Sequence, residues 1–99
     1  MKPNAVEAAL RVAAGHFGVS VADIRSQRRT QTVHPARLWG AYLAAQTSGA
    51  SVADIGAALD GRDETIISMY VRARGRNVDT DEESARLFDL LKRRLRELR

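Results

Sequence analysis

The sequence predicts an all-α domain of about six helices. Apolar residues recur at helical spacing along most of the chain, for example at Val6, Leu10 and Phe17. Helix-capping residues and glycines divide these stretches, and the polar–apolar alternation typical of a β-strand is missing from the sequence. Ninety-nine residues are enough for one hydrophobic core, so we expect residues 1–99 to form a single domain.

The first two helices are predicted from their capping residues. Asn4 can cap a first helix, with Glu7 closing a capping box, and Gly18 ends it. The motif SVADI occurs at residues 20–24 and again at 51–55. Ser caps a helix and the Asp three positions later faces its free N–H groups, so each copy predicts a helix start. The flanking residues do not match at a fixed period, which excludes an internal repeat.

A loop and a long helix follow the first SVADI motif. The segment SQRRTQTV at 26–33 is polar and basic, which predicts a loop. Pro35 is expected as the first residue of the next helix, where its missing N–H costs nothing. That helix should run to about Thr47 and end before Gly49. Because it is almost wholly apolar, we expect it at the centre of the fold, with Trp39 in the core.

Two further helical stretches predict a helix-turn-helix. The first covers residues 51–59, and the second begins at residue 63 and ends near residue 75. Asp60-Gly61-Arg62 supplies the turn between them. Gly56 is small at the point where the second helix must pack closely across the first, and Ile67 is the matching apolar contact.

A last amphipathic helix is expected over residues 81–98, capped by Asp79 or Asp81. Acids in its first turn and the basic run KRRLRELR at its end suit the helix dipole. We expect this helix to close the bundle through an apolar stripe made of Ala85, Phe88, Leu91, Leu95 and Leu98.

The composition argues against several classes of function. Cysteine is absent, and His16 and His34 lack carboxylate partners at metal-binding spacing. No serine lies in a nucleophile elbow. We therefore expect no enzyme, no metal, no cofactor and no small-molecule substrate. No apolar run approaches the ~20 residues of a membrane span, and the first residues lack a signal-peptide core, so we expect a cytoplasmic protein without a membrane partner.

The charge of the chain favours an anionic partner. The net charge is +4, the isoelectric point is about 10.3, and 14 of the 16 basic residues are Arg. Residues 25–37 hold four arginines and no acid, whereas residues 79–83 hold four acids. This segregation predicts one positive face rather than scattered solvated charges. Three arginines lie at the far end of the second helix of the helix-turn-helix, namely Arg72, Arg74 and Arg76. We expect them to form a solvated face or to act through their charge at the helix C-terminus.

Several of these segments, taken in order, resemble the C-terminal DNA-binding domain of DnaA, the bacterial replication initiator. SQRRTQTV is similar to the basic loop of that family, S-K-R-R-S/T-R-S-V. DIG at 54–56 and GRDETII at 61–67 match EIG and the signature G-R-D-H-T-T-V without a gap. The resemblance covers residues 12–76 and implies a DnaA/Trp-repressor-like helix-turn-helix. The chain shows no phosphate-binding loop like that of an ATPase.

The resemblance implies double-stranded DNA as the partner, with the signature helix in the major groove and the basic loop in the neighbouring minor groove. Carried over to this chain, Arg28 or Arg29 would enter the minor groove, and Asp63 and Thr65 would approach base edges. Phosphate contacts are expected from the remaining candidates, Arg37, Ser51 and Arg62.

Glu64 departs from the family, which has His at this position, and Ile66 replaces a Thr. Phosphates repel a carboxylate, but a carboxylate can also accept a hydrogen bond from cytosine N4. Helix capping is the other explanation for Asp63 and Glu64. Ile66 can touch a thymine methyl group or turn into the core. Gln27 and Gln31 also stand where the family often has basic residues. We therefore expect altered or relaxed specificity relative to a DnaA box.

Two hypotheses for the function follow. The first is a nucleoid-associated transcription regulator, because DnaA-like domains occur in bacterial activators such as those of gene transfer agents. Its variant is a competitor for DnaA sites in replication control. The second is a protein-interaction module that has lost base reading. Beyond DNA, the partners expected are the transcription machinery or another domain of a longer protein.

Overall fold

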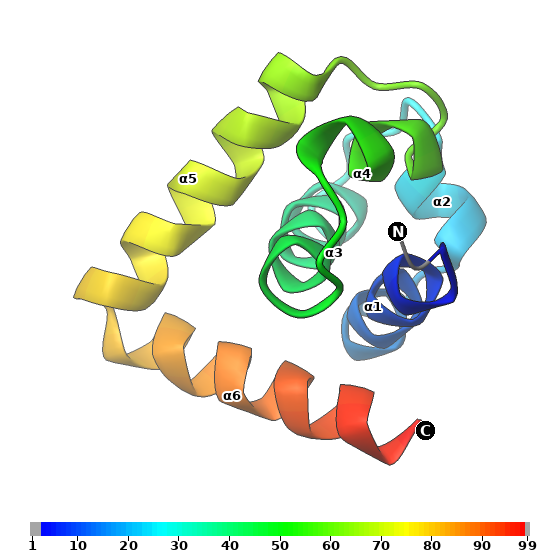
Figure 1. Ribbon diagram of the computed structural model, residues 1–99. Coiled ribbons are helices and arrows are strands. Elements are labelled where there is room, and N and C mark those ends of the chain that lie inside the picture. Colours follow the sequence, from blue (N-terminus) through cyan, green and yellow to red (C-terminus); the bar gives the residue numbers. More distant parts are fainter. Residues whose placement is uncertain (1–2, 99) are drawn as a thin grey trace.

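The computed structural model describes residues 3–98, which form six helices and no strand (Figure 1). The all-α prediction is therefore confirmed for this part of the chain. In order, the helices are α1 (Pro3–Phe17), α2 (Val21–Arg25), α3 (Val33–Thr47), α4 (Val52–Ala58), α5 (Glu64–Thr80) and α6 (Glu82–Glu97).

Helix α3 lies at the centre of the fold, as predicted from its apolar sequence, and α1, α2, α4, α5 and α6 all contact it (Figure 1). Trp39 is 5% exposed, which confirms it as a core residue. Helices α1 and α3 approach closely at Gly40, where an added β-carbon would lie 3.0 Å from Leu10 Cδ2. Helices α5 and α6 meet at an angle and enclose the other side of α3 (Figure 1).

Both SVADI motifs form the capping boxes that the sequence predicts. Ser20 Oγ accepts from the Asp23 backbone N–H at 3.0 Å, and the Asp23 carboxylate accepts from the Ser20 N–H at 3.2 Å. Ser51 and Asp54 repeat this arrangement at 3.1 and 3.3 Å. Each box satisfies N–H groups that a helix start leaves without partners inside the helix.

The starts of α1 and α3 differ from the predictions. Helix α1 already includes Asn4, so the expected N-cap position is wrong, and the side chain on which its capping box depends lies outside the described part of the structure. Glu7 pairs instead with Arg25 of α2, at 2.5 Å. Helix α3 begins at Val33 and not at Pro35. Proline is tolerated at this third position because the N–H groups of the whole first turn lack acceptors inside the helix.

Helix α5 is longer than expected because Gly75 lies inside it and does not end it. This part of α5 packs on α3, where the β-carbon position of Gly75 lies 3.7 Å from Tyr42 Cε1, and this packing outweighs the ~1 kcal/mol helix penalty of a glycine. Asp81 caps α6, as one of the two alternatives predicted, and accepts from the Ser84 N–H at 3.3 Å. Asp79 lies within α5. The apolar stripe of α6 reaches the core at Leu91 and Leu95, whereas Leu98 lies beyond the helix end and is 53% exposed.

Candidate nucleic-acid interface

The turn between α4 and α5 is closed by backbone contacts at Gly56. The Arg62 N–H donates to the Gly56 carbonyl oxygen at 2.9 Å. A β-carbon at position 56 would lie 2.2 Å from the Arg62 carbonyl oxygen, so only glycine fits there. Ile67 is fully buried and lies 3.5 Å from the same point. The small residue predicted at this crossing is therefore required by the turn as well as by the second helix.

The turn itself uses left-handed backbone. Asp60 and Gly61 have φ values of 62° and 75°. Glycine adopts this conformation freely, and Asp is among the few other residues that tolerate it. The two residues lie in the turn that leads from α4 to the exposed start of α5.

Four consecutive residues at the start of α5 are exposed, from Asp63 to Ile66. Asp63 caps the helix and accepts from the Thr65 backbone N–H at 2.7 Å. The capping explanation therefore holds for Asp63. Glu64 forms no hydrogen bond or ion pair within residues 3–98, so its carboxylate faces solvent. Ile66 is 38% exposed, which rules out the alternative that it turns into the core.

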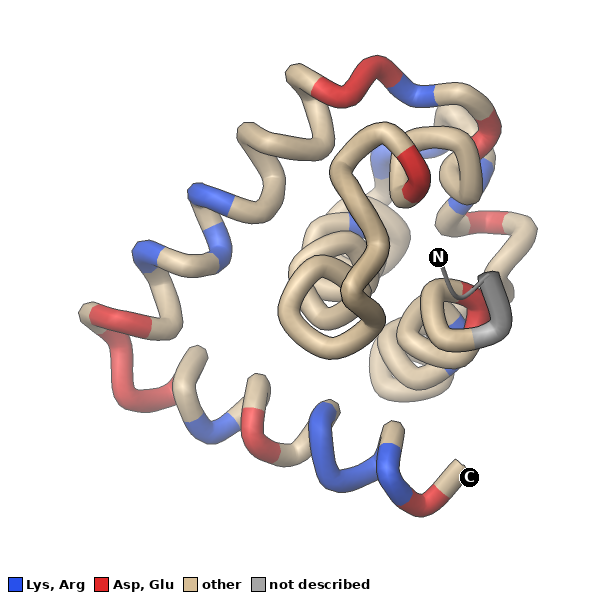
Figure 2. The backbone as a smooth tube through the Cα atoms, viewed as in Figure 1, with Lys and Arg blue, Asp and Glu red and all other residues tan. Residues whose placement is uncertain are grey.

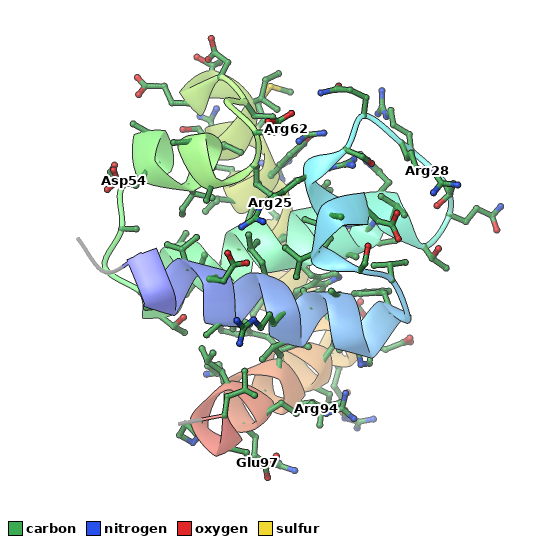
Figure 3. All side chains as sticks on the ribbon, turned by 90° about the vertical axis from the view of Figure 1, so that its right-hand side faces the viewer. Arg25, Arg28, Asp54, Arg62, Arg94 and Glu97 are labelled. Atoms are coloured by element: carbon green, nitrogen blue, oxygen red, sulfur yellow. The ribbon has the colours of Figure 1, made fainter. Side chains whose placement is uncertain are left out.

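The basic loop between α2 and α3 presents two arginines to solvent. The side chains of Arg28 and Arg29 are both exposed, and Figure 3 shows Arg28 projecting from the loop. Arg28 lies 3.4 Å from the Asp23 carboxylate, yet its side chain stays 65% exposed. Such a weak surface ion pair leaves the guanidinium available to a ligand. The loop therefore has the exposed cations that a minor-groove contact requires.

Arg37 was expected to contact phosphate, and the structure corrects this expectation. The residue is only 1% exposed. Its guanidinium donates to the carbonyl oxygens of Asp23, Ile24, Ser26 and Arg28 at 2.7–3.3 Å. Two of these carbonyls belong to the last turn of α2, where a helix leaves acceptors without partners inside the helix, and two belong to the loop that follows. Burial lowers the pKa of Arg37, and its role here is to hold the loop.

Arg62, the other arginine expected on phosphate, is also turned inward. It is half-buried, and Nη1 donates to the carbonyl oxygens of Arg25 and Leu59 at 3.1 and 2.9 Å. Nη2 donates to the Ser26 carbonyl oxygen at 2.5 Å. Figure 3 shows Arg62 next to Arg25, between the α4–α5 turn and α2. A phosphate could accept only from those N–H groups of the Arg62 guanidinium that do not take part in these bonds.

Ser51 is exposed at the start of α4, where its hydroxyl and backbone N–H both serve the capping box. Beside it, a shallow hollow of about 380 Å³ separates α4 from α5. The hollow is lined by Val52, Thr65, Ser68, Val71 and Arg72.

Arg72 is a candidate contact that the sequence interpretation missed. It is exposed, as expected, but it shares this hollow with Thr65. The spacing of seven residues, which puts both side chains on one face of a helix, is the signal that could have found it. Arg74 is not solvated as expected: its guanidinium lies 5.4 Å from the Trp39 ring and donates to Asn77 Oδ1.

The basic residues do not gather on one face, contrary to the expectation from their segregation in sequence. Lys and Arg occur near the loop, along α5 and at the end of α6 (Figure 2). Arg94 on α6 lies at the opposite end of the molecule from Arg28 and Arg62 (Figure 3). Acids mark the start of α5 and the corner between α5 and α6 (Figure 2). The loop and the α4–α5 turn therefore form a small mixed surface and not a broad basic one.

Two kinds of feature are absent from the described part of the chain. No helix in residues 3–98 is both long and apolar enough to span a bilayer. Over the same residues, His, Asp and Glu form no group of three or more that could hold a metal ion.

A helix-turn-helix with an exposed second-helix start, beside a loop with exposed arginines, defines the class of helix-turn-helix DNA-binding domains. Comparison with known families identifies the family within that class. A family described as "Bacterial dnaA protein helix-turn-helix" matches residues 6–73, and the chain belongs to that family. The resemblance noted in the sequence is thereby confirmed.

Individual relatives extend the match to α6. The chain is 41% identical over 88 residues to the chromosomal replication initiator protein DnaA of Xanthobacter autotrophicus, which covers 89% of this chain and 17% of the relative. It is 38% identical to the protein of that name from Bartonella quintana, over 89% of this chain and 18% of the relative. It is 36% identical to the protein of that name from Nitrobacter hamburgensis, over 93% of this chain and 19% of the relative. The chain thus spans less than a fifth of the length of these relatives.

Proposed function

We propose that this domain binds double-stranded DNA, with the start of α5 in the major groove and the loop of residues 26–32 in the adjacent minor groove. The observation that carries the proposal is the bond from Arg62 Nη2 to the Ser26 carbonyl oxygen, 2.5 Å long. It joins the turn that precedes α5 to the first residue of the loop, so the two surfaces can meet one duplex together. Membership of the DnaA helix-turn-helix family supports the same partner.

The exposed residues divide between the two grooves. Glu64 and Thr65 are in the first turn of α5, the part of a recognition helix that contacts base edges. Arg28 and Arg29 extend from the loop, and arginine suits the negative potential of a narrow minor groove. Arg72 lines the hollow between α4 and α5, and Ser51 directly precedes another lining residue, Val52, so both are placed to approach phosphates beside the major groove.

We further propose that the domain regulates transcription, as part of an activator, and that its specificity differs from that of a DnaA box. Helix-turn-helix domains of this kind position regulators on their sites. The difference in specificity rests on Glu64 and Ile66, both exposed where the family has His and Thr. One exchanged base contact is worth ~1–3 kcal/mol of discrimination. Competition for DnaA sites is the variant of this role in replication control.

One observation favours the second hypothesis, a protein-interaction module. Ile66 and Met69 are 38% and 53% exposed, and their spacing places them on the same face of α5. Exposed apolar side chains at helical spacing can dock a partner. A module of this kind would bind DNA weakly, without sequence preference, through charge alone.

The two hypotheses are separated by selecting duplexes from a random pool and then titrating them by fluorescence anisotropy at near-physiological salt. Matched titrations use a DnaA-box duplex and a scrambled duplex. DNA reading predicts a selected sequence bound more tightly than scrambled DNA by about 10³ or more. Equal binding of all duplexes that vanishes as salt rises would refute it and direct the search to a protein partner.

A further inference from the structure

Two arginines from distant parts of the chain donate hydrogen bonds to carbonyl groups at the end of α2. Arg37 reaches them from α3, and Arg62 reaches them from the α4–α5 turn. Both donate to the Ser26 carbonyl oxygen, at 2.7 and 2.5 Å. Since Ser26 is where the basic loop leaves α2, the path of the loop is fixed on one side by the core helix and on the other by the helix-turn-helix.

A second bond runs in the opposite direction between the same two elements. Arg25 Nε donates to the Ala58 carbonyl oxygen, at the end of α4, at 2.9 Å. The Arg25 carbonyl oxygen in turn accepts from Arg62 Nη1 at 3.1 Å. The end of α2 and the α4–α5 turn are thus cross-linked reciprocally (Figure 3), and the far end of the Arg25 side chain is held by Glu7 of α1.

The chemistry of these contacts requires arginine. Arg62 bonds to three carbonyl oxygens in different directions, those of Arg25, Ser26 and Leu59. A planar guanidinium offers its N–H groups in a fixed fork, whereas lysine offers a single compact ammonium. A lysine at position 62 would keep the charge but lose the fixed geometry.

We propose that Arg62 is a positioning residue that sets the distance between the basic loop and the start of α5, and hence between the minor-groove and major-groove contacts. This inference rests on the proposed DNA binding. The affinity of the domain then depends on the distance between the minor-groove and major-groove contacts on one duplex, in addition to the bases at each contact. Arg62 thus contributes to specificity without contacting a base, and Arg25 helps to hold the same two segments in place.

The test compares Arg62→Lys and Arg25→Lys with Arg76→Lys, an exposed arginine on α5 that serves as the matched control. The first measurement uses no DNA: amide hydrogen exchange of residues 26–32 in the free protein. We expect faster exchange in the Arg62 and Arg25 variants and wild-type exchange in the control. Unchanged loop exchange in both variants would overturn the proposal.

The second measurement is the ratio of affinities for the selected and scrambled duplexes. We expect Arg62→Lys to lower this ratio at least about fivefold, the low end of the cost of one mismatched base pair. Affinity for scrambled DNA should stay the same because the charge is kept. A duplex with one base pair inserted between the two half-contacts should be rejected less strongly by the variant than by the wild type.

Direct phosphate contact by Arg62 gives a different pattern. Arg62→Ala would then weaken all duplexes alike and reduce the salt slope by about one unit, which would overturn the positioning role. Failure of the proposed function is distinct: the wild type itself would then prefer no duplex. In that case the amide hydrogen exchange of residues 26–32 alone decides whether Arg62 holds the loop.

Discussion

The Arg62 N–H donates to the Gly56 carbonyl oxygen at 2.9 Å, while the Arg62 carbonyl oxygen occupies the space that a β-carbon at position 56 would need. The helix-turn-helix is therefore closed by backbone against backbone. Neither group can move without opening the turn that presents the start of α5. The integrity of the candidate DNA-binding surface thus depends on the absence of a side chain at position 56.

Gly56→Ala should lower the free energy of unfolding by about 2–3 kcal/mol, because the added methyl group meets a backbone carbonyl that cannot rotate away. Gly15→Ala is the control, since nothing lies within 4 Å of its β-carbon position. It should stabilise α1 by about 0.5–1 kcal/mol. Urea unfolding measures both changes, and equal effects at the two positions would contradict the close approach.

Arg37→Met should destabilise the fold by about 3 kcal/mol, because the carbonyl oxygens of Ile24 and Arg28 would lose the donor that the buried guanidinium supplies. Arg29→Met, an exposed change in the neighbouring loop, should alter stability by less than about 0.5 kcal/mol. Thermal and urea unfolding compare the two variants. A neutral Arg37→Met would show that these hydrogen bonds are not needed to hold the loop.

Ser20→Ala and Ser51→Ala form a matched pair, since both serines cap helices through the same box. Each change should lower stability by about 1 kcal/mol. Only Ser51 lies beside the proposed major-groove surface, so only Ser51→Ala should also weaken binding of the selected duplex. Anisotropy titrations of both variants test this difference. Equal DNA affinities would remove Ser51 from the interface.

Glu64→Gln should raise the affinity for scrambled DNA and lower the preference for the selected duplex. Removing the charge relieves repulsion from phosphates, and it exchanges one of the two carboxylate oxygens that can accept from cytosine N4 for an amide donor, which weakens that contact. Stability should fall by only about 0.3–1 kcal/mol, through the helix dipole. If binding of every duplex stays at the wild-type level, Glu64 lies away from the DNA.

Stability should fall as the pH is lowered from about 8 to about 5. Burial, followed by nearby arginines, lowers the pKa of both His16 and His34 from the ordinary 6.5. The unfolded chain therefore binds more protons than the folded domain below about pH 6.5, and protonation favours unfolding. Urea unfolding across this range should show a flatter dependence in His16→Gln and His34→Gln. An unchanged pH profile in both variants would contradict this assignment.

The features predicted best from the sequence are those that depend on residues close together in the chain. The caps Ser20, Ser51 and Asp63 depend on neighbours within three positions, and all were found as predicted. The partners of Arg37 and Arg62 could not be predicted in this way. Their acceptors are backbone carbonyls, which every residue carries, and fold topology alone decides which of them come near.

The length of α5 was missed for a related reason. Gly75 signals a helix end locally, but packing on α3 continues the helix to Thr80. For the candidate interface, the exposure of Arg28, Arg29, Glu64 and Thr65 agrees with the sequence interpretation. Whether these side chains contact DNA stays a prediction.

The measurement that tests two-groove binding most directly is base-analogue substitution in the selected duplex. Inosine paired with cytosine lacks the guanine amino group, so it presents an A·T-like minor groove and a G·C-like major groove. Each A·T pair is replaced in turn by I·C, and the affinity is measured. Pairs beneath the loop should tolerate the change, while pairs beneath α5 should lose about 1–3 kcal/mol. Equal tolerance at every position would contradict base reading by α5.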